Sequence, residues 1–525
     1  MSLKRLFFII VVPLLIGNVV PAAAQERVFR MALPEGDVVT LDPHGFCCLG
    51  DAQVLFHVYE GLVQYDPQTL QPVPALAESW DISEDGLIYT FHLREATFHN
   101  GRQVIAADVV NSFNRLANPP DGIVPSPTYA ASLIVGSIEG YSDVVDGTAE
   151  QLSGLRAIDE RTVEITLSAP NSALLPALTM VPAAVLPMEA AVDPTTFAEN
   201  PVGTGPFMVE EWVRQDHINL VRNPDYWGEA PALDRVVMRV IPEKSVVLVE
   251  FLAGNLDIAI VPPSDVARIN SDPALQGRVQ NQSILSIWWL TPNLNRPPLD
   301  NLQVRQALAM SIDRQAIVDS VLQGQGVPAH GPLPPGLSAY DPDYDPFPYD
   351  PERARELLVE AGYPDGIDVE FRTWTDEVDG RILTAIQAQW AEVGIRASFN
   401  RTEYTAYIND LTQCNMMIGT QSWTADYADP DNFTIPLATD ASPTAAACGF
   451  GQVPEAKELA LQALTLPLGE ERDALYREAE RVIVENVLGI FVYHKGATLV
   501  VGENVQGAYL DAFNNVILDT VSLTS

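Results

Sequence analysis

Short runs of β-branched and aromatic residues alternate with longer amphipathic segments along this chain. Strand-like runs occur at Val28 to Leu33, Thr162 to Leu167, Ile218 to Arg222, Val236 to Ile241, Asp368 to Arg372 and Gly489 to Tyr493. Such runs suit pleated, buried surfaces, whereas the segments between them repeat their apolar residues with helical spacing. The pattern predicts a mixed α/β protein.

One predicted helix has sequence signals at both ends. Asp350 can accept hydrogen bonds as its N-cap, and Pro351 suits the first helical position. Gly362 and Pro364 then end the helix. Its inward stripe consists of Leu357, Leu358 and Ala361. These features predict core packing and no chemistry.

A second helix is predicted from about Gly380 to Val393, with Gly394 as its stop. One face of it carries Ile382, Ile386, Trp390 and Val393. The proline- and tyrosine-rich segment from Pro332 to Pro351 predicts a long, ordered surface loop.

The first 24 residues have the pattern of a cleavable signal peptide. Lys4 and Arg5 precede an apolar run from Leu6 to Ile16, and small residues follow up to Ala24. The run is shorter than the ~20 residues that a membrane-spanning helix needs. We expect cleavage after Ala24 and export to the periplasm as a soluble protein, without a lipid anchor because no cysteine lies at the cleavage site.

Length and charge narrow the class of protein. A chain of 525 residues exceeds one ordinary core, and at about 150 residues per domain it suggests about three units. The formal net charge of −39 makes nucleic acid or an anionic membrane an unfavourable partner. A large negative surface commonly serves solubility.

Four cysteines enter an oxidising compartment, where disulfides are permitted. We favour a bond between Cys414 and Cys448. The adjacent pair Cys47 and Cys48 fits either a vicinal disulfide or buried thiols. The cysteines lack the Cys-x-x-Cys spacing of a zinc or thioredoxin-like site, so we expect no metal.

The stretch from Trp423 to Phe433 reads Trp-Thr-Ala-Asp-Tyr-Ala-Asp-Pro-Asp-Asn-Phe and sets acids beside aromatic rings at a turn. A carboxylate beside aromatic rings lies in a reduced dielectric, where it binds an ammonium group more strongly than it would in water. A solvated Asp-Pro turn is the alternative interpretation.

Catalytic motifs do not emerge from the sequence. It has no Gly-x-Ser-x-Gly elbow, no Walker loop and no His-Glu-x-x-His motif. A secreted hydrolase would need a nucleophile paired with a base, and no such pairing is visible. We therefore expect no enzyme activity and no cofactor.

Several distinctive sequence blocks follow one another along the chain. The early blocks begin at Gly61, Pro74, Tyr89 and Ala107, and the later ones at Asn200, Arg222, Gly254, Val304 and Ala354. Among them are Asn-Pro-Val-Gly-Thr-Gly-Pro-Phe (200–207) and Arg-Asn-Pro-Asp-Tyr-Trp-Gly (222–228). In this order, the blocks resemble those of the extracytoplasmic peptide-binding proteins of ABC importers, the family 5 solute-binding proteins. The resemblance spans essentially the whole mature chain.

This resemblance implies a two-lobed periplasmic binding protein fold with an extra inserted domain, three domains in all, around a ligand cleft. We expect lobe I at 26–60, 204–292 and 488–525, the extra domain at 61–203, and lobe II at 293–487. Strands that cross near Asn293 and Asn486 would form the hinge. Closure would bury the ligand, and a membrane permease would recognise the closed monomer.

The resemblance also implies a site. Asp426 matches the carboxylate that takes the ligand's α-amino group in similar peptide binders, and Trp423 and Tyr427 would wall the pocket. The strand edge around Gly419 to Ser422, with Gln421, would offer backbone groups to a peptide. Weaker candidates for cleft positions are Asp37, Trp288 and Trp289. For the aromatic residues, ordinary packing is the alternative.

One departure from the family limits the choice of ligand. Similar dipeptide binders carry an arginine ahead of the helix that begins here near Gly380, to hold the ligand's carboxylate. This chain has three acids there, Asp376, Glu377 and Asp379, whose repulsion would disfavour a free carboxylate. Arg381 is a possible substitute. A longer peptide or a cationic amine therefore fits better than a free dipeptide.

The leading hypothesis is a periplasmic protein that binds a peptide or peptide-like amine and delivers it to an ABC permease. An oligosaccharide, opine or nickel chelate would keep the same transport role, although sparse histidines argue against bare nickel. A sensor or chaperone on the same fold is an alternative of another class.

Overall fold

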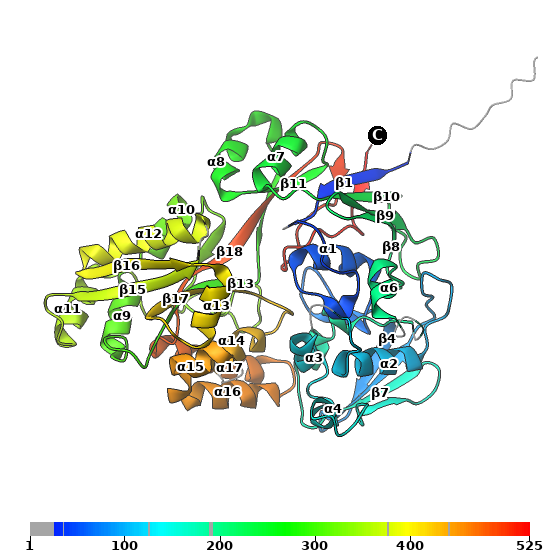
Figure 1. Ribbon diagram of the computed structural model, residues 1–525, viewed down its shortest axis with the longest axis horizontal. Helices are drawn as coiled ribbons and strands as arrows, with labels where there is room; N and C mark the ends of the chain where they lie inside the picture. The colour runs from blue at the N-terminus through cyan, green and yellow to red at the C-terminus, as the bar shows by residue number, and fades with distance from the viewer. Residues whose placement is uncertain are drawn as a thin grey trace, which may run out of the picture.

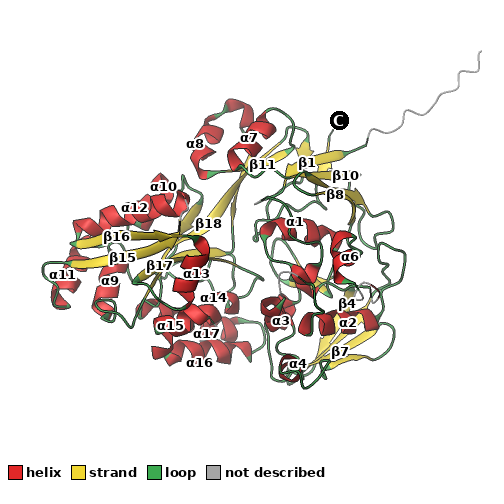
Figure 2. Cartoon of the chain, viewed as in Figure 1, coloured by secondary structure: helices red, strands yellow, loops and turns green. Residues whose placement is uncertain are grey.

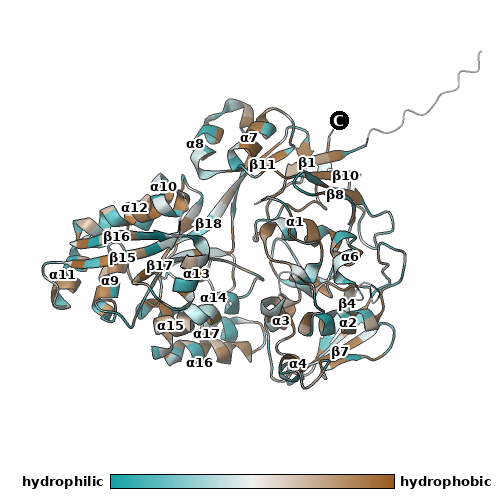
Figure 3. Cartoon of the chain, in the orientation of Figure 1, coloured by the Kyte–Doolittle hydropathy of each residue, from teal (hydrophilic) through white to brown (hydrophobic). Residues whose placement is uncertain are grey.

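The computed structural model describes residues 26–524 except 35, 124–126, 188, 190–192, 375–376 and 439–441. The expected signal peptide, with its cleavage site after Ala24, lies outside the described residues. Within the described part, no helix is long and apolar enough to cross a bilayer. The helices in Figure 3 carry hydrophilic as well as hydrophobic residues.

The first sheet has four strands in the order β1, β10, β9, β8. They span Val28–Ala32, Arg235–Arg239, His217–Arg222 and Phe207–Val213. Strand β1 runs parallel to β10, and the other neighbours are antiparallel. The sheet therefore joins the chain start to a segment two hundred residues later. Beside it lie α1 (Leu49–Val58) and α6 (Pro194–Glu199) (Figure 1).

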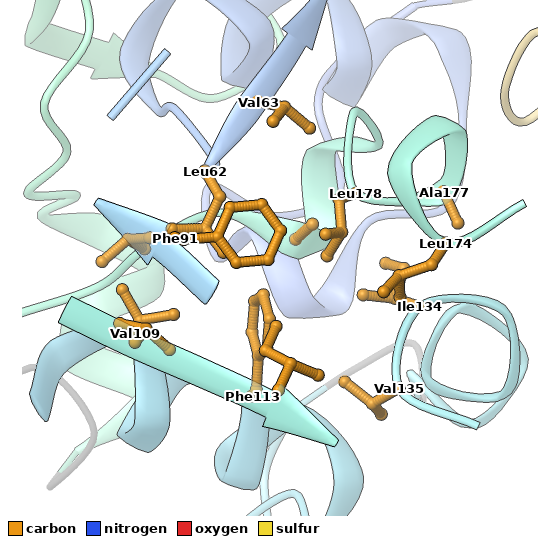
Figure 4. Packing of buried hydrophobic residues seen from close by; sticks show 14 of the residues in the cluster. Leu62, Val63, Phe91, Val109, Phe113, Ile134, Val135, Leu174, Ala177 and Leu178 are labelled. Atoms are coloured by element: carbon orange, nitrogen blue, oxygen red, sulfur yellow. The ribbon is translucent and has the colours of Figure 1, made fainter. Parts of the chain in front are cut away.

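A second four-stranded sheet has the order β4, β5, β7, β6. Together with the first sheet it forms the right-hand body of the molecule in Figure 1, and the largest sheet with its helices, described next, forms the left-hand body, except for the end of that sheet at the top of the figure. Its strands are Ala77–Ile82, Ile88–Leu93, Thr162–Thr166 and Leu155–Ala157. Helices α2 (Ala106–Ala117), α3 (Thr128–Ile134), α4 (Tyr141–Val145) and α5 (Leu174–Ala177) accompany it. Figure 4 shows Phe91 and Phe113 at the centre of its core, which is drawn from residues 62–185 with Tyr427 as the one distant member.

The largest sheet has the strand order β11, β18, β13, β17, β15, β16, and β12 and β14 also pair with β18. Its strands, in the order of the chain, are β11 Ile258–Val261, β12 Val279–Ser283, β13 Ser286–Pro292, β14 Gly326–Pro328, β15 Ile367–Trp374, β16 Ile395–Thr402, β17 Ile418–Thr424 and β18 Ile490–Val501. Two short pairs, β2 (Val63–Tyr65) with β3 (Pro72–Pro74) and β19 (Val505–Gln506) with β20 (Ser522–Leu523), complete the strands.

Helices cover this sheet on both faces (Figure 2). They are α9 Leu302–Met310, α10 Arg314–Ser320, α11 Pro351–Glu360, α12 Glu377–Glu392, α13 Tyr404–Thr412, α14 Asp431–Ala438, α15 Pro443–Cys448, α16 Pro454–Leu464 and α17 Glu470–Glu485. At the β11 end, α7 (Lys244–Leu252) and α8 (Pro263–Ser271) pack around a small separate core.

Strand β18 connects the two bodies. Its second half, from Gly496, pairs with β11 and β12, whereas its first half, up to Lys495, pairs with β13 and β14. In Figure 1 it runs from the body on the left to the elements at the top. Its pairing partners therefore change between Lys495 and Gly496. All seven residues of β13 are buried in the left-hand part of the sheet. The hinge expected near Asn293 and Asn486 stays a prediction.

The predicted helix ends are confirmed at α11, where the Asp350 side chain accepts a hydrogen bond from the Arg353 amide. Helix α12 begins three residues before the predicted Gly380 and ends one before Val393. Residues 329–350 form the expected long loop without helix or strand, although Leu333, Leu337 and Ala339 of this loop are buried in the core. The domain boundaries expected from the resemblance stay a prediction.

Candidate functional site

A cavity of about 700 Å³ lies between the two bodies. One wall comes from β11, α7 and the adjoining loops at the top of the molecule, and consists mainly of apolar residues: Ile241, Val247, Ile258, Ile260, Pro262 and Pro263. The other wall comes from β13, β15, β17, the first half of β18 and α13, and is aromatic: Trp288, Trp374, Tyr404, Tyr407, Trp423 and Tyr493. Its size falls within the range of small-molecule sites, and its two-sided lining allows a ligand to hold the bodies together.

Strand β17 contributes Thr420, Gln421, Ser422 and Trp423 to the cavity lining, on the side of the aromatic wall. It pairs with β13 along its whole length, but β15 pairs with only its first two residues, Ile418 and Gly419. Within the described part of the chain, no strand covers the β15 side of residues 420–424. Tyr407 donates a hydrogen bond to the Thr420 carbonyl there.

Asp426 lies two residues beyond the end of β17, where α3 of the right-hand body meets the left-hand body. Its Oδ2 accepts hydrogen bonds from the Tyr129 hydroxyl at 3.0 Å and from the Asn432 side-chain amide at 3.1 Å. Among the described residues no donor reaches Oδ1 of this carboxylate. Burial raises the pKa of Asp426, and the bonds from Asn432 and Tyr129 act in the opposite direction.

The Asn432 side chain hydrogen-bonds to both Asp426 and Trp423 and so fixes their positions relative to each other. Its side-chain carbonyl accepts both the Asp426 amide, at 3.0 Å, and the Trp423 indole N–H, at 3.1 Å. The Tyr129 ring meets the Trp423 ring edge to face, with centroids 6.2 Å apart. Trp423 is part of the cavity lining, whereas Asp426 lies just beyond that lining.

The remaining residues of the acidic turn are structural. Tyr427 is 3% exposed, packs in the core of the right-hand body and donates a hydrogen bond to Asp431. Asp429 accepts two contacts from the buried Arg472 guanidinium, whose Nε donates to Ser172 of the right-hand body. Burial raises the pKa of Asp431 well above its usual range. Tyr427 therefore does not wall the cavity, contrary to the expectation from sequence.

Two other predicted residues have different surroundings. Asp37 is not part of the cavity lining, because its carboxylate accepts the Trp212 indole N–H and the Gln215 amide and so fastens the β8–β9 turn. Trp288 lines the cavity while it is 1% exposed, and its indole N–H donates to Asp379 at 2.9 Å. Asp376 and the side chain of Glu377 lie outside the described part of the chain. Neither Trp289 nor Arg381 lines the cavity.

The sequence analysis missed Lys244 and Lys495 among the cavity residues. Lys244 begins α7, and Lys495 lies at the crossing point of β18, where its ammonium donates to the Ser422 hydroxyl at 3.2 Å. The sequence does offer one signal for these two residues, because lysine is rare in it: the whole sequence contains four lysines.

The structure joins Cys414 to Cys448 through a disulfide. Cys47 and Cys48 form no disulfide, their sulfur atoms lie 2.6 Å apart, and Cys47 also contacts the Asp51 carboxylate. These three residues form a potential metal-ligand cluster at the N-terminal end of α1. Asp51 already accepts the backbone amides of Val39 and Cys47, so its first role is to hold this loop.

Comparisons with known proteins identify relatives that bind solutes outside the cell. Residues 71–444 match the model for bacterial extracellular solute-binding proteins, family 5 Middle. The chain is 32% identical to heme-binding protein A of Haemophilus influenzae, covering 88% of this chain and 87% of that protein. It is 30% identical to the dipeptide-binding protein of Escherichia coli, covering 89% of each.

Solved structures share the fold. The periplasmic binding protein DppA from Helicobacter pylori, in complex with the peptide STSA, superposes with a TM-score of 0.75 at 27% identity, covering 95% of this chain and 98% of that one. A dipeptide-binding protein from Pseudoalteromonas, in complex with Met-Leu, has a TM-score of 0.77 at 25% identity, covering 95% and 100%.

Proposed function

This chain belongs to the family 5 bacterial extracellular solute-binding proteins, and from that premise we propose that it binds a peptide or peptide-like amine in the periplasm and delivers it to an ABC permease. Solute binding for ABC import is the role of the family, and it needs no catalytic group. The identity of the ligand is the further part of this proposal. Two of the similar solved structures contain bound peptides.

The observation that carries the proposal is the position of Asp426 just past the uncovered edge of β17. An extended peptide that pairs with residues 421–424 would bring its first residue toward this carboxylate. A protonated amino terminus would then donate to Oδ1, which accepts no bond from the described residues, while Tyr129 and Asn432 hold Oδ2. Main-chain pairing makes such a site tolerant of side-chain sequence.

Ligand binding would also explain how the bodies close. The apolar wall and the aromatic wall belong to different bodies, and both line one cavity. A ligand drives closure only by as much as it binds the closed arrangement more tightly than the open one. A peptide held along β17 gains its additional contacts from the apolar wall of the other body, and the permease would recognise the closed form.

Heme is a second candidate ligand. It is favoured by the name of the relative that is 32% identical, heme-binding protein A, and by the six aromatic rings of the cavity, which suit a flat apolar molecule. A peptide fits the uncovered strand edge better, since a porphyrin has no main chain to pair with it.

Isothermal titration calorimetry with short peptides tests the proposal. We expect binding of peptides with free amino termini, and a loss of about 10-fold to 100-fold in affinity in Asp426→Asn, because a hydrogen bond to a charged group contributes roughly 1.5–3 kcal/mol. N-acetylated peptides should bind the two proteins equally. Asp146→Asn is the matched control, since Asp146 is exposed and lies outside the cavity lining.

Either of two results would contradict the proposal. If peptides bind but Asp426→Asn and N-acetylation leave the affinity unchanged, the amine is not held by this carboxylate. If heme binds and none of the peptides does, the ligand class is wrong, although the transport class stands.

A further inference from the structure

Two adjacent cysteines, Cys47 and Cys48, lie at the N-terminal end of α1 and take no part in the binding of the proposed ligand. Their sulfur atoms are 2.6 Å apart, whereas the other two cysteines of the sequence form the Cys414–Cys448 disulfide. Cys47 is exposed and Cys48 is half-buried. A small reagent in solution can therefore reach this pair, and access is one of the conditions for thiol–disulfide exchange.

The distance between the two sulfur atoms distinguishes a disulfide from a metal site. A disulfide bond is about 2.0 Å long, so the two atoms need to approach by only about 0.6 Å to form one. Two thiolates that share a tetrahedral zinc ion, each about 2.3 Å from it, lie about 3.8 Å apart. The sulfur atoms would have to separate to hold a metal together with Asp51. The geometry favours a bond between the sulfur atoms.

Asp51 holds Cys47 beside its neighbour. Its buried carboxylate accepts the Cys47 amide at 3.3 Å and the Cys47 thiol at 3.4 Å through Oδ2, while Oδ1 accepts the Val39 amide at 2.8 Å. Burial, together with Cys48 and Asp51, raises the pKa of Cys47. The Cys47 side chain therefore rests as a thiol, and exchange proceeds through its small thiolate fraction.

Helix α1 connects the cysteine pair to the cavity. The Cys48 carbonyl accepts the Ala52 amide at 3.0 Å, which is the first hydrogen bond of the helix. Leu49 and Gln53 of the same helix line the cavity. The Gln53 side chain also makes two hydrogen bonds to the backbone of Val516, another lining residue, at 2.9 and 2.8 Å. A change in the backbone at Cys48 therefore acts on the edge of the cavity.

A bond between adjacent cysteines requires such a change. Cα atoms joined by a trans peptide are about 3.8 Å apart, whereas most disulfides join Cα atoms that are about 4.4–6.8 Å apart. Closure must therefore adjust the backbone between Cys47 and Cys48, and a disulfide outside the usual geometry is more easily reduced. In contrast, Cys414 and Cys448 are 5.2 Å apart at Cα and 7% and 0% exposed, so mild reagents leave their bond intact.

We propose that Cys47 and Cys48 form a reversible redox site that reacts with small disulfides such as oxidised glutathione, and that its closure loosens the first turn of α1 at the edge of the cavity. The Cys47 thiolate attacks one sulfur of oxidised glutathione and releases one glutathione, which leaves a mixed disulfide on Cys47. The Cys48 thiol then loses its proton, attacks the Cys47 sulfur and releases the second glutathione. The cysteine pair loses two electrons, oxidised glutathione gains them, and the two cysteine protons pass to the two glutathione thiols.

Mass spectrometry of the intact mature protein tests the covalent step. The protein is first treated with dithiothreitol under native conditions and then with excess oxidised glutathione. The wild type should lose two hydrogen atoms, retain no glutathione and lose both of its alkylatable thiols, and a second treatment with dithiothreitol should restore them. Cys48→Ser should stop at the mixed disulfide and retain one glutathione.

Hydrogen exchange of α1 tests the structural consequence. The Ala52 amide should exchange several-fold faster in the oxidised wild type than in the reduced wild type, because closure disturbs the Cys48 carbonyl that it binds. The double variant Cys47→Ser with Cys48→Ser is the matched control, and its exchange should be the same before and after treatment with oxidised glutathione. Helix α11, which lies in the other body, should be unaffected in every sample.

Three results would overturn the inference, and none of them depends on the proposed ligand. Two wild-type thiols that stay alkylatable after the treatment would show that the pair does not react with small disulfides. Glutathione retained on the wild type would show that Cys48 does not resolve the mixed disulfide. Closure without faster exchange in α1 would show that the redox state does not reach the edge of the cavity.

Discussion

At the residue scale, the proposed function rests on the Asp426 carboxylate. Asp426 was visible in the sequence because its motif resembles that of peptide binders, and the structure adds that Tyr129 and Asn432 orient its carboxylate. Lys495 was not visible, because it belongs to no motif and reaches Ser422 only through the strand order of the sheet. Sequence spacing does not reveal a neighbour that is 73 residues away along the chain.

The pH dependence of amine binding is a prediction at this scale. Burial raises the pKa of Asp426, so the carboxylate takes up a proton at a higher pH than an ordinary aspartate. The neutral acid cannot pair with an ammonium group. Affinity for peptides with free amino termini should therefore fall as the pH is lowered from about 7 toward about 4, as measured by calorimetry across that range.

The same titration in Asp426→Asn provides the control. Its weaker binding should show no such decline over this range, apart from any change that N-acetylated peptides also show. If the wild type and the variant lose affinity in parallel, another group is responsible.

At the scale of elements, local sequence signals predicted the ends of a helix correctly, whereas the sequence did not predict the length of a strand that is set by its pairing partners. The ends of α11 follow from Asp350, Pro351 and Gly362, because caps act within a few residues of the helix. Strand β18 was predicted as Gly489 to Tyr493 but runs from Ile490 to Val501, since its second half pairs with β11 and β12 in the other body. Its length is decided by tertiary pairing.

The buried pair of Arg472 and Asp429 gives a prediction at this scale. Their side chains are 1% and 3% exposed, and Arg472 also donates to Ser172, so the pair ties α17 to the acidic turn and to the right-hand body. Removing one partner leaves an uncompensated buried charge. Arg472→Met should lower the free energy of unfolding by about 3–5 kcal/mol, as measured by chemical denaturation.

The double variant Arg472→Met with Asp429→Leu should recover part of that loss, because it removes the stranded charge. Arg268→Met serves as the control, since the ion pair between Arg268 and Asp265 is exposed and should contribute little. A single variant as stable as the wild type would show that the buried pair does not hold these elements together.

At the scale of the whole molecule, the cavity belongs to neither body alone. Its apolar wall and its aromatic wall are joined through β18, and α3 meets the end of β17 through Tyr129 and Asp426. The resemblance of ordered sequence blocks was enough to identify the two-lobed fold. It could not supply the composition of the cavity, because the lining residues come from segments distributed between Met31 and Val516.

A crystal structure of the mature protein with a bound tripeptide tests the central claim most directly. We predict that the peptide lies along β17, with its amino nitrogen within about 2.7–3.2 Å of Asp426 Oδ1. A peptide bound in the reverse direction, or one whose amino nitrogen does not contact Asp426, would contradict the account.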